Sequence, residues 1–172
     1  MNELDSDKVE KLRSRIDSHA DSIMGIVDEI IHPYCGDLDK YVEFIASCLN
    51  DGENPPTDEE LDDFCLNLST QLYFAGGMCE QLGIRDDISR AVYKEVYNTV
   101  RNEQTSGTIA DKDSIAELYS QTEQLTSVCY TRAYKMLKAK IDAAQELLSS
   151  CKKVVSRRMT EAELTRIAGG VA

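Results

Sequence analysis

The residues of this chain that could do chemistry are basic side chains in its C-terminal third. Arg132, Lys135 and Lys138 recur every three residues, which would align them along one side of a helix. A second group follows toward the end of the same segment: Lys152, Lys153, Arg157 and Arg158. Lys and Arg neutralise phosphates whatever the base sequence, and tyrosine rings can stack on unpaired bases. The pattern predicts a surface for single-stranded nucleic acid.

The same basic residues have a second interpretation, which the sequence leaves open. Residues 129–159 carry eight basic and two acidic side chains, although the formal net charge of the whole chain is −12. Cations near the C-terminal end of a helix complement the helix dipole. They can also pair with acidic groups elsewhere in this chain or on a neighbouring molecule. Both roles are compatible with the uneven distribution of charge.

Motifs of catalysis and of tightly held cofactors are missing from the sequence. It contains no P-loop, no G-x-S-x-G, no H-E-x-x-H and no dinucleotide-binding glycine pattern. His19 and His32 would lie on different faces of one helix. The six cysteines include no C-x-x-C pair, which favours reduced, buried thiols over disulfides or a zinc module. We therefore predict that the protein is not an enzyme and holds no metal or cofactor.

A long helix must position the basic groups, and the sequence predicts one over about residues 109–159. This stretch has no proline or glycine, and the helix would be roughly 75 Å long. From Tyr130 onward, apolar and small residues recur in steps of four and three, a heptad seam. The seam comprises Tyr130, Tyr134, Leu137, Ile141, Ala144, Leu148, Cys151 and Val155. One helix cannot bury such a seam alone, so we predict self-association; the two tyrosines could instead stack on bases.

Further helices are predicted before and after the long one. Their expected ranges are 8–31, 38–49, 58–82, 87–104 and 161–168. Pro33 and Gly83 are the predicted stops, and Asp7, Asp37, Thr57, Thr108 and Thr160 are the predicted N-terminal caps. The pair Gly76-Gly77 indicates either a close helix approach or kink, or a hinge. Because no strand-like alternation occurs, the predicted fold is an all-α helical bundle.

Composition predicts three regions and a cellular location. Residues 1–56 form an acidic helical region, 57–159 a helical core with the long helix, and 160–172 a short helix and tail. No run approaches 18 uncharged apolar residues, and the N-terminus lacks the apolar core of a signal peptide. We expect a cytoplasmic protein with no membrane partner.

Several short segments between residues 72 and 159 follow one another in a recognisable order. They are Leu72–Ala75, Tyr93–Arg101, a turn closed by Gly107, Tyr130–Lys135 and Ser149–Arg158. In this layout the chain resembles the UvsY family of phage recombination mediators. That family is small, helical and non-enzymatic, acts as a homo-oligomer, and loads a RecA-like recombinase onto single-stranded DNA. The resemblance implies that Lys94 and Arg101 face DNA together with Arg132, Lys135 and Lys138, in the cytoplasm of a phage-infected bacterium.

Three functions remain open at this point. The leading one is a non-enzymatic DNA-recombination accessory protein that binds single-stranded DNA and a RecA-like recombinase or other protein partner. The second is a phage structural, assembly or adaptor protein that acts through helix–helix contacts. The third is an inhibitor whose acidic surface imitates nucleic acid and occupies a basic partner site.

Overall fold

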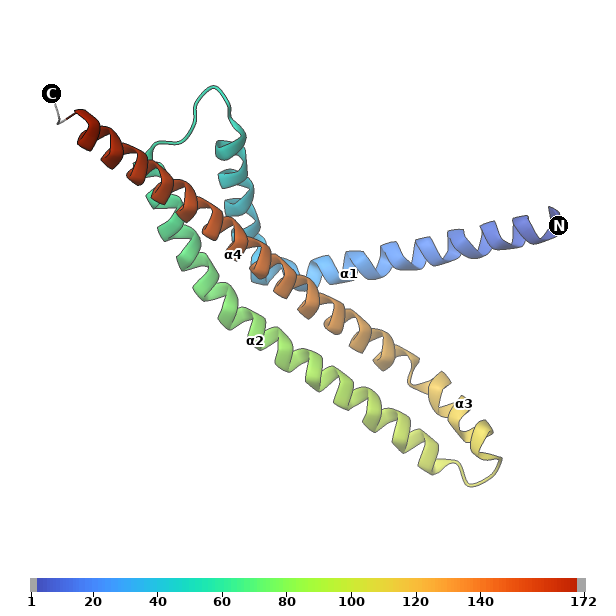
Figure 1. Cartoon of the computed structure of the whole chain (residues 1–172). Helices are drawn as coiled ribbons and strands as arrows, with labels where there is room; N and C mark the ends of the chain where they lie inside the picture. Colours follow the sequence, from blue (N-terminus) through green and yellow to red (C-terminus); the bar gives the residue numbers. More distant parts are fainter. Residues whose placement is uncertain (1–2, 170–172) are drawn as a thin grey trace. The chain divides into compact units, whose positions relative to one another are not determined.

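The computed structural model of this chain describes residues 3–169, with the side chains of residues 8–167. Four helices account for these residues: α1 (Glu3–Asn50), α2 (Asp58–Glu103), α3 (Ile109–Tyr119) and α4 (Gln121–Gly169) (Figure 1). The structure is 92% helical and has no strand in the described part of the chain. The prediction of an all-α fold with a very long C-terminal helix is confirmed at this level. None of the described helices is both long and apolar enough to cross a bilayer.

The chain forms two compact units, and each long helix contributes to both. Unit 1 joins the chain up to Pro33 with Gln81–Met136, and unit 2 joins Tyr34–Glu80 with the chain from Leu137 onward. Unit 1 therefore contains the first part of α1, the last part of α2, all of α3 and the start of α4. The regions predicted from composition, with limits at residues 56 and 159, stay a prediction.

The core of unit 2 is built from apolar residues seven positions apart on three helices. They are Leu38 and Ile45 of α1, Leu61 and Leu68 of α2, and Leu137, Ala144 and Cys151 of α4, all of them buried. A spacing of seven residues is close to two helical turns, so each helix directs one stripe inward. Phe44 and Phe64 add an edge-to-face contact with ring centroids 5.8 Å apart. In unit 2, the three long helices are therefore held together by apolar residues that recur every seven positions.

The core of unit 1 draws on all four helices. Its buried apolar residues are Val27 and Ile31 of α1, Leu82 of α2, Ala116 of α3, and Cys129 and Ala133 of α4. Gly83 of α2 packs against the ring of Tyr134, where a Cβ atom would lie 3.2 Å from Tyr134 Cε2. This glycine therefore permits a close contact of α2 with a tyrosine of α4, and the prediction that Gly83 ends a helix is wrong.

Pro33 lies inside α1, and the two helices predicted at 8–31 and 38–49 are one. An interior proline removes a backbone hydrogen bond and costs about 3 kcal/mol. Buried residues stand on both sides of it, with Ile31 before and Cys35 and Leu38 after. Their burial outweighs the local cost of the proline, which is why the predicted stop and the Asp37 cap were wrong.

The helices predicted at 58–82 and 87–104 are likewise continuous as α2, and Gly76-Gly77 lies within it. A Cβ atom at either glycine would meet nothing within 4 Å, so no neighbouring helix approaches closely there. The close-approach interpretation of this pair is therefore wrong. A kink or a hinge at the pair stays a prediction.

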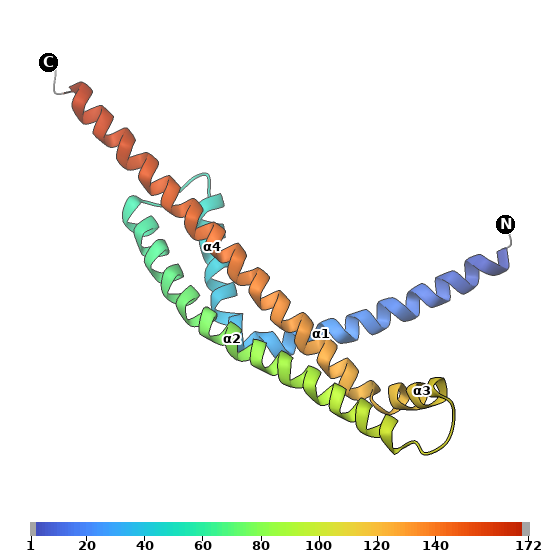
Figure 2. The same cartoon turned by 60° about the horizontal axis from the view of Figure 1, so that its bottom comes forward.

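The long C-terminal helix begins later and ends later than predicted (Figure 2). A break at Ser120 separates α3 from α4, and the Ser120 hydroxyl there donates to the Ala116 carbonyl over 2.7 Å. At the other end no break occurs near Met159. Thr160 Oγ1 donates to the Ser156 carbonyl inside α4, so this threonine does not act as an N-cap.

Two of the predicted capping boxes are confirmed. The Thr57 backbone N–H donates to Glu60 Oε2 over 2.7 Å, and the Glu60 N–H donates back to Thr57 Oγ1 over 3.2 Å. Thr108 and Asp111 form the same reciprocal pair at the start of α3, directly after Gly107, which has a positive φ of 98°. The side chain of Asp7 lies outside the described residues, and α1 already begins before it.

Candidate nucleic-acid interface

Three predicted DNA-contacting residues are exposed along α4: Arg132, Lys135 and Lys138. They recur every three residues on a continuous helix, as predicted. Ala133 and Leu137, which alternate with them, are fully buried, so the basic side chains point away from the core. None of the three makes an ion pair with another described side chain. Their charges are therefore available to a partner.

Two other predicted DNA-facing residues lie on the last part of α2. Lys94 is exposed. Arg101 is half-buried and its Nε donates to Asp113 Oδ1 of α3, which also accepts a 3.2 Å hydrogen bond from the Tyr97 hydroxyl. Arg101 thus connects α2 to α3 inside unit 1. For this residue, pairing with an acid of the same chain describes the structure better than an open DNA contact.

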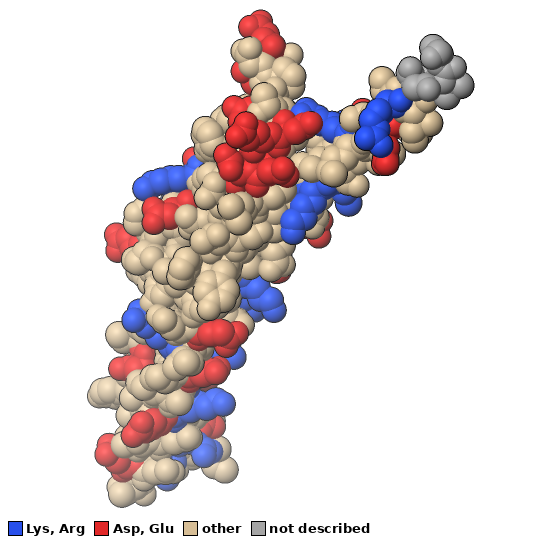
Figure 3. Space-filling view, turned by 90° about the vertical axis from the view of Figure 1, so that its left-hand side faces the viewer, with Lys and Arg blue, Asp and Glu red and all other residues tan. Residues whose placement is uncertain are grey.

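In the C-terminal basic group of α4, some residues likewise pair with acids of the same chain and others are exposed. Arg158 donates to the Pro56 carbonyl over 2.8 Å and to Asp58 Oδ1 over 2.9 Å, so it holds the start of α2 in unit 2. Arg157 lies 3.7 Å from Glu161 one turn later, a solvated pair that stabilises little. Lys152 and Lys153 are exposed. Figure 3 shows acidic and basic side chains interspersed on the face it presents, with one dense acidic group.

Sequence reasoning missed polar contacts at two places in the structure, one in each unit. In unit 1, the buried Asp86 carboxylate accepts hydrogen bonds from Arg90 and, over 2.6 Å, from the Thr131 hydroxyl. In unit 2, Lys140 Nζ lies 2.8 Å from Asp39 Oδ2. The i, i+4 spacing of Asp86 and Arg90 could have suggested the first pair. Thr131 and Lys140 are too distant in sequence from their partners for any local signal.

The predicted seam of α4 is largely turned inward. Leu137, Ile141, Ala144 and Cys151 are buried, and the remaining seam residues are half-buried: Tyr130, Tyr134, Leu148 and Val155. The heptad pattern thus identified the inward face of α4 correctly. Its role between copies of the chain stays a prediction, because within each unit α1 and α2 already supply partners for this face.

The buried cysteines are poor candidates for nucleophilic chemistry. All six thiols are free, as predicted, and four of them are buried: Cys35, Cys79, Cys129 and Cys151. Burial raises the pKa of the Cys79, Cys129 and Cys151 thiols above their ordinary value. A raised pKa leaves less of the reactive thiolate near neutral pH. Among the described residues, no group of three or more His, Cys, Asp or Glu could hold a metal ion.

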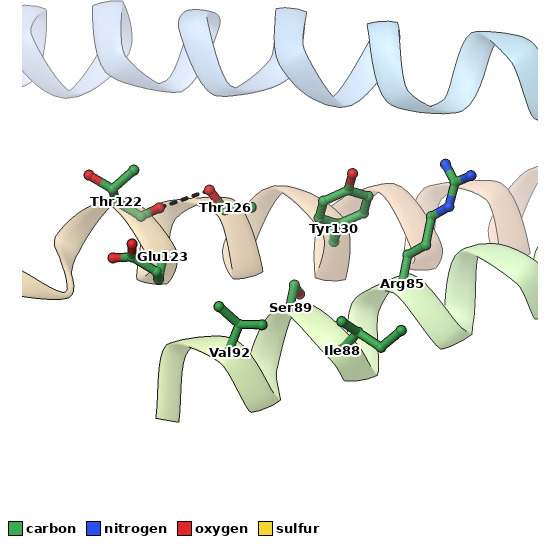
Figure 4. A pocket seen from close by; sticks show the side chains of 8 residues that line it. All are labelled: Arg85, Ile88, Ser89, Val92, Thr122, Glu123, Thr126 and Tyr130. Atoms are coloured by element: carbon green, nitrogen blue, oxygen red, sulfur yellow. Dashed lines mark hydrogen bonds between the residues drawn. The ribbon is translucent and has the colours of Figure 1, made fainter. Parts of the chain in front are cut away.

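An open groove runs between α2 and α4 in unit 1, with a volume of about 350 Å³ (Figure 4). Apolar parts of Ile88, Val92 and Tyr130 line it, and Thr126 completes one wall. Arg85 and Glu123 lie toward its opposite ends (Figure 4). Glu123 Oε2 is buried and has no hydrogen-bond partner within the part of the chain that the structure describes. A buried carboxylate oxygen is costly to leave without a donor, so a donor brought into the groove would stabilise it.

Comparison of this chain with protein-family models, with curated proteins and with solved structures finds no match. The candidate interface therefore rests on its own geometry and charge.

Proposed function

We propose that this protein is a non-enzymatic DNA-recombination accessory protein that binds single-stranded DNA and a RecA-like recombinase in the cytoplasm. The observation that carries the proposal is the row of exposed cations on α4: Arg132, Lys135 and Lys138. These residues lack acidic partners among the described side chains, whereas Arg101 and Arg158 are already paired. The resemblance in layout to the UvsY family supports the same function. It also supports action as a homo-oligomer.

The proposed contact is electrostatic and independent of base sequence. Each cation that meets a phosphate releases condensed counterions, so affinity falls steeply with salt. Residues Asp142 and Glu146 follow Lys138 on the outer side of α4 and are also exposed. Their negative charge would confine the DNA contact to the stretch before them. The acidic parts of the chain would then repel nucleic acid or meet a basic protein partner.

The test is fluorescence anisotropy of a labelled single-stranded oligonucleotide titrated with the full chain at about 50 and 200 mM salt. The triple variant Arg132→Glu, Lys135→Glu, Lys138→Glu should abolish binding at the lower salt. A triple change to glutamine, which only removes contacts, should reduce the slope of log affinity against log salt by about 2, since each single-strand phosphate contact contributes roughly 0.7.

A charge-retaining variant provides the matched control. Arg132→Lys, Lys135→Arg, Lys138→Arg changes the same three exposed positions but keeps three positive charges, so its affinity should stay close to that of the original chain. Absence of binding by the original chain at about 50 mM salt would reject the proposal, as would equal binding by the glutamate variant.

A second candidate, an assembly or adaptor protein, is favoured by exposed apolar side chains on α2. Tyr73 and Phe74 are exposed and contact each other edge-to-face with ring centroids 5.5 Å apart, and Leu66 is exposed on the same helix. Large exposed apolar residues that share a helix often mark a contact with another helix. A protein that forms a defined complex through these residues and has no DNA affinity would support this candidate over the first.

A further inference from the structure

The first turns of α1 carry an apolar stripe that nothing in the described chain covers. Val9, Leu12 and Ile16 are 64%, 57% and 59% exposed. Farther along the same helix, Val27 and Ile31 occupy the corresponding side and are buried in unit 1. The spacing of three and four residues is that of a helix face that packs on other helices. We define residues 8–20, which bear the exposed part of this stripe, as the arm.

The groove of unit 1 has the size and lining that this stripe requires. Residues Thr122–Tyr130 of α4 form one side of the groove and rise by about 12 Å, while Val9 to Ile16 rise by about 10 Å. Ile88 and Val92 on the other side are exposed. Apolar stripe and apolar groove would therefore bury each other along their full length.

Charges on the arm complement those of the groove. Arg13 and Arg15 flank the stripe on its two sides, and Lys8 borders it at the level of Val9. A guanidinium from this segment would supply a donor to the buried, unpartnered Glu123 Oε2.

The geometry points to a second copy of this chain as the source of the arm that fills the groove. Within one chain, α1 is an uninterrupted helix whose Val27 and Ile31 are anchored in unit 1. Its arm could reach the groove of its own unit only if the helix broke between Ile16 and Val27. Between two copies no helix need break, and the contact is made twice under two-fold symmetry. The protein is thus a reciprocal arm-exchanged dimer, and this conclusion does not depend on DNA binding.

The test is analytical ultracentrifugation of the full chain without DNA, over about 1 to 100 μM protein. The original chain should sediment as a dimer. The variant Leu12→Asp, Ile16→Asp should raise the dimer dissociation constant by about 100-fold or more, because it places two charges against an apolar groove. Both residues are exposed in the single chain, so helix content by circular dichroism should stay unchanged.

Ser14→Asp, Ser18→Asp is the matched control. It adds the same two negative charges to the same turns of α1 on the side opposite the stripe, and it should leave the dimer intact. The groove variant Ile88→Asp, Val92→Asp should be monomeric alone. Mixed in equal amounts with the arm variant, it should recover a dimer held by one arm and one groove.

Three results would overturn the inference. A monomeric original chain at about 100 μM would exclude the exchange. A dimer that survives the arm variant would place the contact elsewhere. A dimer broken by the arm variant but unaffected by the groove variant would show that two arms pair with each other. Charge exchange adds an independent check: Glu123→Arg should weaken the dimer, and Arg13→Glu, Arg15→Glu in the same chain should restore it.

Discussion

At the scale of single residues, Asp86 is a buried charged group in unit 1 whose loss should cost stability. Its side chain is 4% exposed and accepts hydrogen bonds from Arg90 on the same helix and from Thr131 on α4. A buried carboxylate is tolerated because these donors replace water. Removal of the carboxylate leaves the Thr131 hydroxyl without its acceptor, whereas Arg90 keeps a 3.3 Å hydrogen bond to Thr131 Oγ1 and is half exposed, so most of the cost comes from the buried Thr131 contact.

We predict that Asp86→Ala lowers the free energy of unfolding by about 2–3 kcal/mol. Urea denaturation followed by circular dichroism measures the change. The neighbouring Asp87 is exposed, and Asp87→Ala should change stability by no more than about 0.5 kcal/mol. Equal effects of the two substitutions would show that the Asp86 contacts contribute no net stability.

The buried thiols predict how stability depends on pH. Burial raises the pKa of Cys79, Cys129 and Cys151 in the folded chain, whereas in the unfolded chain these thiols ionise near their ordinary value. Above the ordinary value the unfolded state loses protons that the folded state keeps. Stability is therefore fully present below the unfolded pKa and is lost as the pH rises toward the folded pKa.

The expected result is a fall in the urea midpoint between about pH 8 and pH 10, since free thiols ionise near 8.5. Cys151→Ala removes one of the contributing groups and should make the fall shallower. The measurement is urea denaturation at closely spaced pH values under reducing conditions. A midpoint that stays level, or that rises with pH, would contradict the assignment of these thiols as neutral buried groups.

At the scale of elements, α1 lacks one backbone hydrogen bond at Pro33, which lies inside the helix. Pro33 is exposed, has no N–H to donate to the carbonyl of Glu29, and stands between the buried Ile31 and Cys35. The helix continues because apolar burial on both sides compensates for the lost bond. Replacement of the proline should therefore stabilise the chain rather than disturb it.

We predict that Pro33→Ala raises the free energy of unfolding by about 1–3 kcal/mol, given the cost of an interior proline. His32→Ala, at the adjacent exposed position, is the control and should have little effect. Thermal or urea denaturation compares the two variants. If Pro33→Ala lowered stability, the proline would itself stabilise α1, for instance by restricting the backbone conformation of the residue before it.

At the scale of the whole molecule, the heptad seam of α4 bears on whether a single chain is stably folded before it associates with another copy. Leu137 is fully buried in unit 2, so its packing belongs to the single chain. Leu137→Ala should lower the free energy of unfolding by about 2–5 kcal/mol. Leu125, exposed on the same helix, provides the comparison, and Leu125→Ala should cost far less.

The concentration dependence of these variants separates folding from association. A contact within one chain gives the same loss at every protein concentration, whereas a contact between copies makes the loss depend on concentration. We expect the Leu137→Ala loss to be constant over a hundredfold range of concentration when it is measured in the Leu12→Asp, Ile16→Asp background. If the loss of stability depended on protein concentration in that background, the seam would instead be packed between copies of the chain.

The sequence by itself determined the fold class and the inward face of the long C-terminal helix. Heptad spacing from Leu137 to Val155 predicts burial because side chains seven residues apart share a helix face, and this relation is local. The capping boxes at Thr57 and Thr108 were equally readable, since each involves residues three apart. The free, mostly buried thiols followed from the absence of paired cysteine motifs.

Only the tertiary structure decided where helices continue and which charges are free. Pro33 and Gly83 are strong local stops, yet burial of Ile31, Leu38 and Leu82 on distant partners outweighed them. The pairing of Arg101, Lys140 and Arg158 with acids of the same chain leaves Arg132, Lys135 and Lys138 as the exposed, unpaired row. Long-range packing sets both outcomes, because local propensities amount to a few kcal/mol and the partners that override them lie far away in sequence.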